Sequence, residues 1–136
     1  MNKILIVLPN DVMGGAEQYL FEICQFLSEN NKVNVIFLKK PITQFWNNNI
    51  HNNNVELLYL DATVEKIGLI KFFKWTFFNK SKFNYAITSH LHLNSIIGFL
   101  RKLSLIKINN HVARESTFIF DRFSGLKLLE FKLFYN

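Results

Sequence analysis

The chain has 136 residues, which is the length of one domain. Hydrophobic residues make up 49% of it, with 15 Phe, so a disordered chain is excluded and one apolar core can form. The net charge of +6 favours anionic partners, although an AT-rich genome also produces many Lys residues. The basic residues are scattered and do not alternate with aromatic ones, so we predict no nucleic-acid partner.

The cysteine content and the N-terminus bear on the compartment. Cys24 is the only cysteine, so no internal disulfide can form and a reducing compartment is expected. The apolar run at residues 3–8 is too short for a signal peptide, and no segment reaches the roughly 18 apolar residues of a membrane span. The sequence predicts a cytoplasmic protein, and contact with the inner face of the cell membrane stays open.

The first third of the chain predicts strand, helix and strand. Residues 3–8, "KILIVL", form a continuous apolar run typical of a strand covered on both faces. Residues 15–29 carry apolar side chains at helical spacing, and residues 32–38, "KVNVIFL", predict a second strand. Pro41 breaks the chain and a polar stretch runs up to Asn54, in which the low-complexity residues 47–54, "NNNIHNNN", predict a loop.

The middle of the chain repeats this alternation. Residues 55–60, "VELLYL", predict a third strand and residues 64–79 a helix. A fourth strand is expected at residues 84–89, followed by a helix at residues 93–103.

The last part predicts a fifth strand at residues 106–113 and a helix at residues 121–135. Alternating strands and helices with apolar strands indicate an α/β fold, a Rossmann-like three-layer arrangement around a parallel sheet. Residues 1–136 are expected to form one domain. The last apolar helix has no following strand to return to, so we expect a domain that is cut short.

The loop after the first strand is the leading candidate site. Gly14 and Gly15 precede a predicted helix N-terminus, where free N–H groups suit phosphate or sugar oxygens, and Glu17 lies in the first turn. The alternative is a tight turn that binds nothing. A dinucleotide site is disfavoured, because the glycines are adjacent and the second strand ends in Lys39 and Lys40. The chain also lacks the P-loop pattern.

Three segments together carry a family resemblance. The segment "KILIVLPNDVMGGAEQYLFEICQFLSENNKVNVIFL" resembles the N-terminal domain of GT-B glycosyltransferases of family 4, whose first loop ends in Gly-Gly-(Ala/Thr)-Glu. "YAITSHLHLNSIIGFLRKL" resembles the later strand–His–helix segment of that family, and "HVARES" resembles the next strand and loop. The resemblance implies a GT-B N-terminal, acceptor-side domain that lacks the second domain of the family.

The resemblance also implies roles for individual residues. Family members transfer a sugar with retention of configuration from a nucleotide-sugar to an acceptor, often a lipid-linked or cell-envelope saccharide. On that basis His90 is the candidate catalytic residue, and Gly14, Gly15, Glu17 and Arg114 are candidate substrate-binding residues. His92 is a weaker candidate. His51 and His111 carry no functional indication, and we expect neither a metal nor a cofactor.

The family binds the nucleotide-sugar donor in a second domain, so the chain is expected to need such a domain for activity. The main alternative is a non-catalytic acceptor-binding subunit that pairs with a separate donor-binding chain. An unrelated Rossmann-like nucleotide-binding module is a third interpretation. Residues 67–78, "IGLIKFFKWTFF", mix lysines with apolar residues, which fits either a peripheral membrane contact or a helix packed on the sheet with snorkelling lysines.

Overall fold

The computed structural model describes residues 1–114, and the helix predicted for residues 121–135 lies outside them. A five-stranded parallel sheet in the order β3-β2-β1-β4-β5 forms its centre. The strands are β1 (Lys3–Leu8), β2 (Lys32–Lys39), β3 (Val55–Ala62), β4 (Lys82–Thr88) and β5 (Lys107–Ala113). The α/β prediction with a parallel, Rossmann-like sheet is therefore confirmed.

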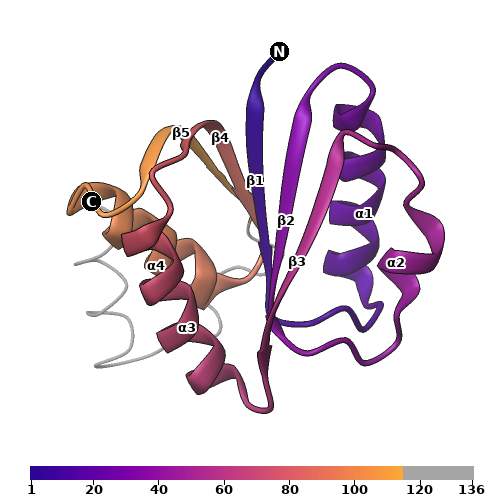
Figure 1. Ribbon diagram of the computed structural model, residues 1–136, viewed down its shortest axis with the longest axis horizontal. Helices are drawn as coiled ribbons and strands as arrows, with labels where there is room; N and C mark the ends of the chain where they lie inside the picture. The colour runs from indigo at the N-terminus through magenta and orange to yellow at the C-terminus, as the bar shows by residue number, and fades with distance from the viewer. Residues whose placement is uncertain (115–136) are drawn as a thin grey trace, which may run out of the picture.

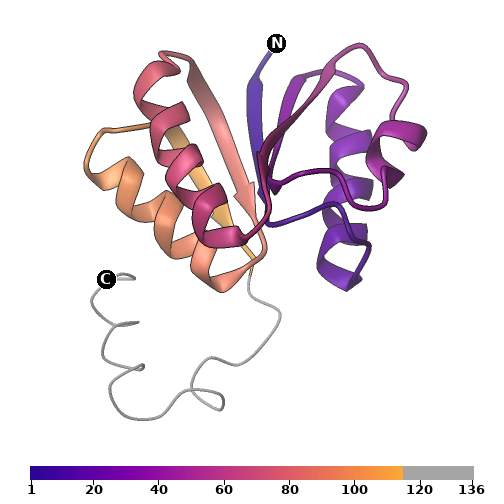
Figure 2. The same cartoon turned by 60° about the horizontal axis from the view of Figure 1, so that its bottom comes forward.

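Helices cover both faces of this sheet. They are α1 (Gly15–Ser28), α2 (Phe45–Asn49), α3 (Glu65–Phe78) and α4 (Leu91–Lys102). Figure 1 shows α1 and α2 on one side of the sheet and α3 and α4 on the other, and Figure 2 shows the same three layers from another angle. All five predicted strands and the three helices predicted within residues 1–114 are present, with boundary shifts of at most a few residues.

The alternation of side chains along β1 explains the two cores. Leu5 and Val7 point into the cluster beneath α3 and α4, whereas Ile4 and Ile6 point into the cluster beneath α1 and α2. A strand buried on both faces must be apolar throughout, which is why "KILIVL" shows no alternation.

The polar stretch after Pro41 departs from the predicted loop. The short helix α2 interrupts it, because Trp46 is fully buried against Phe21 and Phe37, at ring-centroid distances of 5.0 and 5.3 Å. One large aromatic residue therefore anchors a segment that is otherwise rich in Asn. Composition alone pointed to a loop at residues 47–54, and the prediction was wrong for residues 47–49, which belong to α2.

The strand order places a topological switch point between β1 and β4. From β1 the chain passes through α1 to β2, whereas from β4, on the other side of β1, it passes through α4 to β5. The two connections leave β1 and β4 in opposite directions. In α/β sheets such a switch point, at the carboxyl ends of the strands, is where ligands bind.

Candidate functional site

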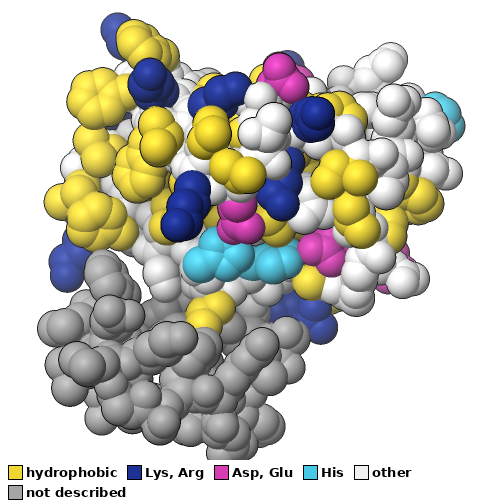
Figure 3. All heavy atoms as spheres, turned by 90° about the horizontal axis from the view of Figure 1, so that it is seen from below, with side chains coloured by type: hydrophobic (Ala, Val, Ile, Leu, Met, Phe, Trp, Pro, Cys, Tyr) yellow, Lys and Arg dark blue, Asp and Glu magenta, His cyan; other side chains and the backbone are white. Residues whose placement is uncertain are grey.

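The loops after β1 and β4 bring charged side chains together at this switch point. The N-termini of α1, α3 and α4 all lie at the carboxyl edge of the sheet. Figure 3 looks onto that edge and shows histidine side chains lying between acidic ones in the middle of the face. These groups come from segments up to 75 residues apart in sequence, so only the fold assembles them.

Neither glycine of the first loop is required by the turn. Gly14, the N-cap of α1, has φ −122°, and Gly15 is already helical, so neither occupies the left-handed region that favours glycine. A Cβ on Gly15 would meet nothing within 4 Å, whereas one on Gly14 would lie 2.7 Å from Oε2 of Glu17. The surface at Gly15 is therefore open, and Gly14 leaves room for the Glu17 carboxylate.

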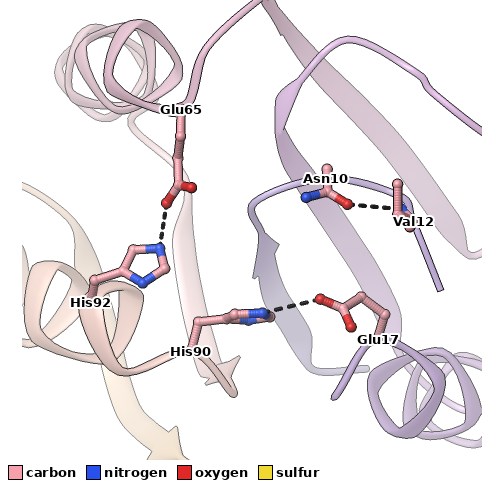
Figure 4. Close-up of polar contacts among 6 residues, drawn as sticks. All are labelled: Asn10, Val12, Glu17, Glu65, His90 and His92. Atoms are coloured by element: carbon pink, nitrogen blue, oxygen red, sulfur yellow. Dashed lines mark hydrogen bonds and ion pairs between the residues drawn. The ribbon is translucent and has the colours of Figure 1, made fainter. Parts of the chain in front are cut away.

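Glu17 and His90 form the centre of the site. Nε2 of His90 lies 3.0 Å from Oε1 of Glu17, and the two side chains are 23% and 11% exposed. Figure 4 shows Glu17 reaching from α1 toward the ring of His90, the N-cap of α4. The contact joins the two helix N-termini across the switch point between β1 and β4. Two residues predicted separately as site residues are thus in direct contact.

The charge state of His90 follows from its surroundings. Burial lowers the pKa of His90 below its usual value, and this outweighs the opposite effect of the Glu17 carboxylate. The ring is therefore neutral at pH 7. Because a carboxylate only accepts hydrogen bonds, Nε2 carries the proton and donates it to Glu17. Nδ1 is then an acceptor, and it is buried without a hydrogen-bond partner among residues 1–114.

A second histidine–carboxylate pair lies beside the first. Nε2 of His92 is 2.5 Å from Oε1 of Glu65, the first residue of α3, and Figure 4 shows the two pairs side by side. The His90 and His92 rings are 5.9 Å apart. This pair ties α3 to α4, so His92 is held mainly by Glu65. Nothing in the sequence singled out Glu65, because its partner His92 is 27 residues away.

Arg114 reaches α1 from the end of β5. Its guanidinium carbon lies 4.0 Å from the centre of the Tyr19 ring, which is a cation–π contact. The N–H of Arg114 donates to the Thr88 carbonyl at 2.9 Å, and its own carbonyl accepts from Nδ2 of Asn94 at 3.2 Å. The structure gives Arg114 no carboxylate partner within residues 1–114.

His111, to which the sequence assigned no role, belongs to a buried network behind the site. The Thr88 hydroxyl donates to Oδ1 of Asn94 at 2.5 Å and lies 2.8 Å from Nε2 of His111. Since the hydroxyl proton is already engaged, Nε2 of His111 must be the donor in the second contact. Burial and then the nearby Arg101 lower the pKa of His111 to about 4.

Asp11 is a further residue that the sequence did not single out. Its buried carboxylate accepts the backbone N–H groups of Ile42, Thr43 and Gln44, with distances of 2.8–3.3 Å. The loop after β1 is thereby fixed to the loop after β2. Its place directly beyond a strand end was the available indication, but its partners lie about 30 residues away.

The described part of the chain contains neither a cluster of metal ligands nor a helix that could span a membrane. Within residues 1–114, no group of three or more His, Cys, Asp or Glu side chains is placed to hold a metal ion. None of the helices in this range combines the length and apolar character needed to cross a bilayer.

Comparison with known proteins adds no assignment. The chain matches no model of a protein family, and it matches neither a curated protein nor a solved structure.

Proposed function

We propose that the chain is an acceptor-side domain of a GT-B glycosyltransferase, similar to family 4, that acts on a lipid-linked or cell-envelope saccharide. The observation that carries the proposal is the contact between Glu17 and His90 across the switch point of the sheet. The family resemblance assigns functions to two separate segments, Gly-Gly-Ala-Glu and the His after β4. In the folded chain these segments adjoin.

The chemistry of His90 supports binding of a hydroxyl group. A neutral ring whose Nε2–H is engaged by Glu17 offers Nδ1 as a hydrogen-bond acceptor, and a sugar hydroxyl is a suitable donor. Because Nδ1 is covered while the ring is 23% exposed, its use requires a small local rearrangement. A buried acceptor without a partner costs roughly 1–3 kcal/mol, which a ligand hydroxyl would recover in part.

The roles of the other site residues follow in this proposal. Glu17 orients the His90 ring and fixes its tautomer. Gly15 leaves the helix N-terminus open to a phosphate or sugar oxygen, and Arg114 attracts an acidic acceptor group. We expect sugar transfer only when a donor-binding domain is also present. In the family that the chain resembles, that domain holds the nucleotide-sugar.

Binding measurements on the chain test the proposal. Titration with a panel of saccharides and nucleotide-sugars, followed by NMR, is expected to shift the Gly14 and Gly15 amides and the His90 ring signals. Gly15→Ala should weaken binding about tenfold, which corresponds to about 1.4 kcal/mol, because its methyl group occupies the open approach. Gly98→Ala is the matched control, since a Cβ there also meets nothing within 4 Å but lies within α4.

Three outcomes separate the interpretations. Ligand-induced shifts confined to other parts of the chain, or none at all, would overturn the proposal. Equal binding by the Gly15→Ala and Gly98→Ala variants would remove the role assigned to Gly15. If saccharides bind but no transfer follows when a donor-binding domain and nucleotide-sugar are supplied, the non-catalytic acceptor-binding subunit becomes the better interpretation.

A further inference from the structure

The outer face of α3 is unusual for a helix that covers a sheet. Its inner face is formed by Gly68, Phe72 and Thr76, which are buried. Its outward side is also apolar, with five exposed hydrophobic side chains: Ile67, Ile70, Phe73, Phe77 and Phe78. A helix that is apolar all round is normally enclosed on every side. We therefore expect another molecule to cover the exposed side of α3.

Lysines are interspersed with these apolar side chains. Lys66 and Lys74 are exposed on the outward side of α3, and Lys80 follows the helix. Lys71 is held by the Asp61 carbonyl at 2.8 Å. The sole acidic residue of α3, Glu65, is engaged by His92 at the helix start. Within residues 1–114, none of these lysines has a carboxylate partner.

The helix on the opposite face of the sheet differs in both respects. α1 contains no Lys or Arg, and its exposed side carries Glu22, Gln18 and Gln25. Phe26, at 71% exposure, lies on this helix, which contains no lysine. Figure 3 shows hydrophobic side chains gathered beside Lys and Arg side chains in its upper left part. The outer face of α3 thus combines apolar and basic side chains, which the exposed side of α1 does not.

We propose that the outer face of α3 docks on an anionic phospholipid bilayer. The exposed rings of Phe77 and Phe78, at 74% and 84%, would enter the headgroup region, and Lys66 and Lys74 would contact lipid phosphates. A bilayer satisfies apolar and cationic groups together. This inference does not rest on the proposed function, because it uses none of the site residues.

The charge pattern argues against a second copy of the chain as the occupant. A two-fold symmetric contact places the same patch on both subunits, so the lysines of one α3 would face the lysines of the other. Such a contact would bury like charges without partners, which is unfavourable. An anionic surface has the complementary charge.

Vesicle co-sedimentation of the full chain tests the proposal. We expect binding to vesicles of phosphatidylcholine with phosphatidylglycerol, little binding to phosphatidylcholine alone, and weaker binding as salt rises. Lys66→Gln combined with Lys74→Gln should reduce affinity about 30-fold, at about fivefold per lysine. Phe77→Ser should reduce it about tenfold or more. Because these side chains are exposed, the melting temperature should stay within a few degrees of that of the unmodified chain.

Variants on the opposite face are the matched controls. Phe26→Ser removes an equally exposed ring from α1, and Lys32→Gln removes an exposed lysine at the start of β2; both should bind as the unmodified chain does. Absence of vesicle binding would overturn the proposal, as would equal losses from the α1 and α3 variants. So would a concentration-dependent dimer, seen by light scattering, that Phe77→Ser abolishes, because a second copy would then be the occupant.

Discussion

Gly14 and Gly15 are adjacent in sequence but differ in what surrounds them. Only at Gly14 does an added Cβ meet another group, the Glu17 carboxylate oxygen at 2.7 Å. That contact involves the end of a flexible side chain, so the fold can accommodate Ala at position 14 by moving Glu17. The same movement removes the partner of His90. One methyl group should therefore alter the electrostatics of the site more than the stability of the fold.

We predict that Gly14→Ala lowers the pKa of His90 further, because Glu17 raises it and the displaced carboxylate no longer does. NMR titration of the His90 ring protons measures this shift. The free energy of unfolding should change by less than about 1 kcal/mol. Gly15→Ala is the control and should leave the His90 titration unchanged. Identical titrations in the Gly14→Ala variant and the unmodified chain would contradict the geometry described for Glu17.

His111 makes the stability of the fold depend on pH. Its pKa is about 4 in the folded chain and about 6.5 when unfolded, so between these values the unfolded chain binds a proton that the folded chain does not. The contribution of His111 to the free energy of unfolding is therefore fully present above pH 6.5 and is lost as the pH is lowered toward 4. His90 acts in the same direction, since its pKa is lowered too.

We predict that His111→Gln reduces this acid-induced loss of stability. The Gln amide can still donate to Thr88 but does not titrate. Denaturant melts at pH 7 and pH 4.5 should differ less for this variant than for the unmodified chain, although the His90 contribution remains. His51→Gln, at an exposed loop position, is the control and should leave the difference unchanged. A pH dependence that is the same in all three proteins would refute the role of His111.

At the level of secondary structure elements, Gly68 sets how closely α3 approaches the sheet. A Cβ at this position would lie 2.5 Å from the Leu38 carbonyl oxygen and 2.8 Å from the Leu38 Cβ. Leu38 belongs to β2, an interior strand, so its backbone has little freedom to shift. The helix itself would have to move outward, and its buried Phe72 would then lose contacts with the core beneath it.

We predict that Gly68→Ala destabilises the fold by about 2 kcal/mol, despite the better helix propensity of Ala. Gly98→Ala in α4 is the matched control; it meets nothing within 4 Å and should stabilise by about 0.4–1 kcal/mol. Denaturant midpoints at a common slope give both values. Equal stability of the two variants would mean that α3 can move away from β2 at little cost.

Periodicity predicted the elements well but not what joins them. Strands β1 and β2 are nearly continuous apolar or β-branched runs, and the other elements alternate with turn residues along the chain, so local pattern suffices to place them. Helix α2 was missed because its stability comes from Trp46 packing on Phe21 and Phe37, which is a tertiary effect. Asp11 was missed for the same reason, since its three donors belong to another loop.

At the scale of the whole molecule, parallel topology explains how far the candidate site could be predicted. Carboxyl ends of parallel strands share one edge, and Gly14, Gly15, Glu17 and His90, which the sequence singled out separately, all follow such strand ends. That Glu17 binds His90, and that Glu65 binds His92, depends on side-chain directions that no spacing rule fixes. The glycosyltransferase assignment remains a proposal that rests on the resemblance and on this contact.

Because one sheet carries both helical layers, we expect the described fold to open as a single unit. Cys24 provides a probe: it is fully buried on the inner face of α1, and burial raises the pKa of its thiol to about 12. A thiol reagent should therefore label Cys24 only in molecules that have opened.

If opening is global, Gly68→Ala on the other face should accelerate labelling by about 30-fold, the equivalent of about 2 kcal/mol. Gly98→Ala should slow it. Timed labelling of the three proteins under native conditions decides the matter. Equal rates in all three would show that α1 detaches on its own, without loss of the α3–α4 layer.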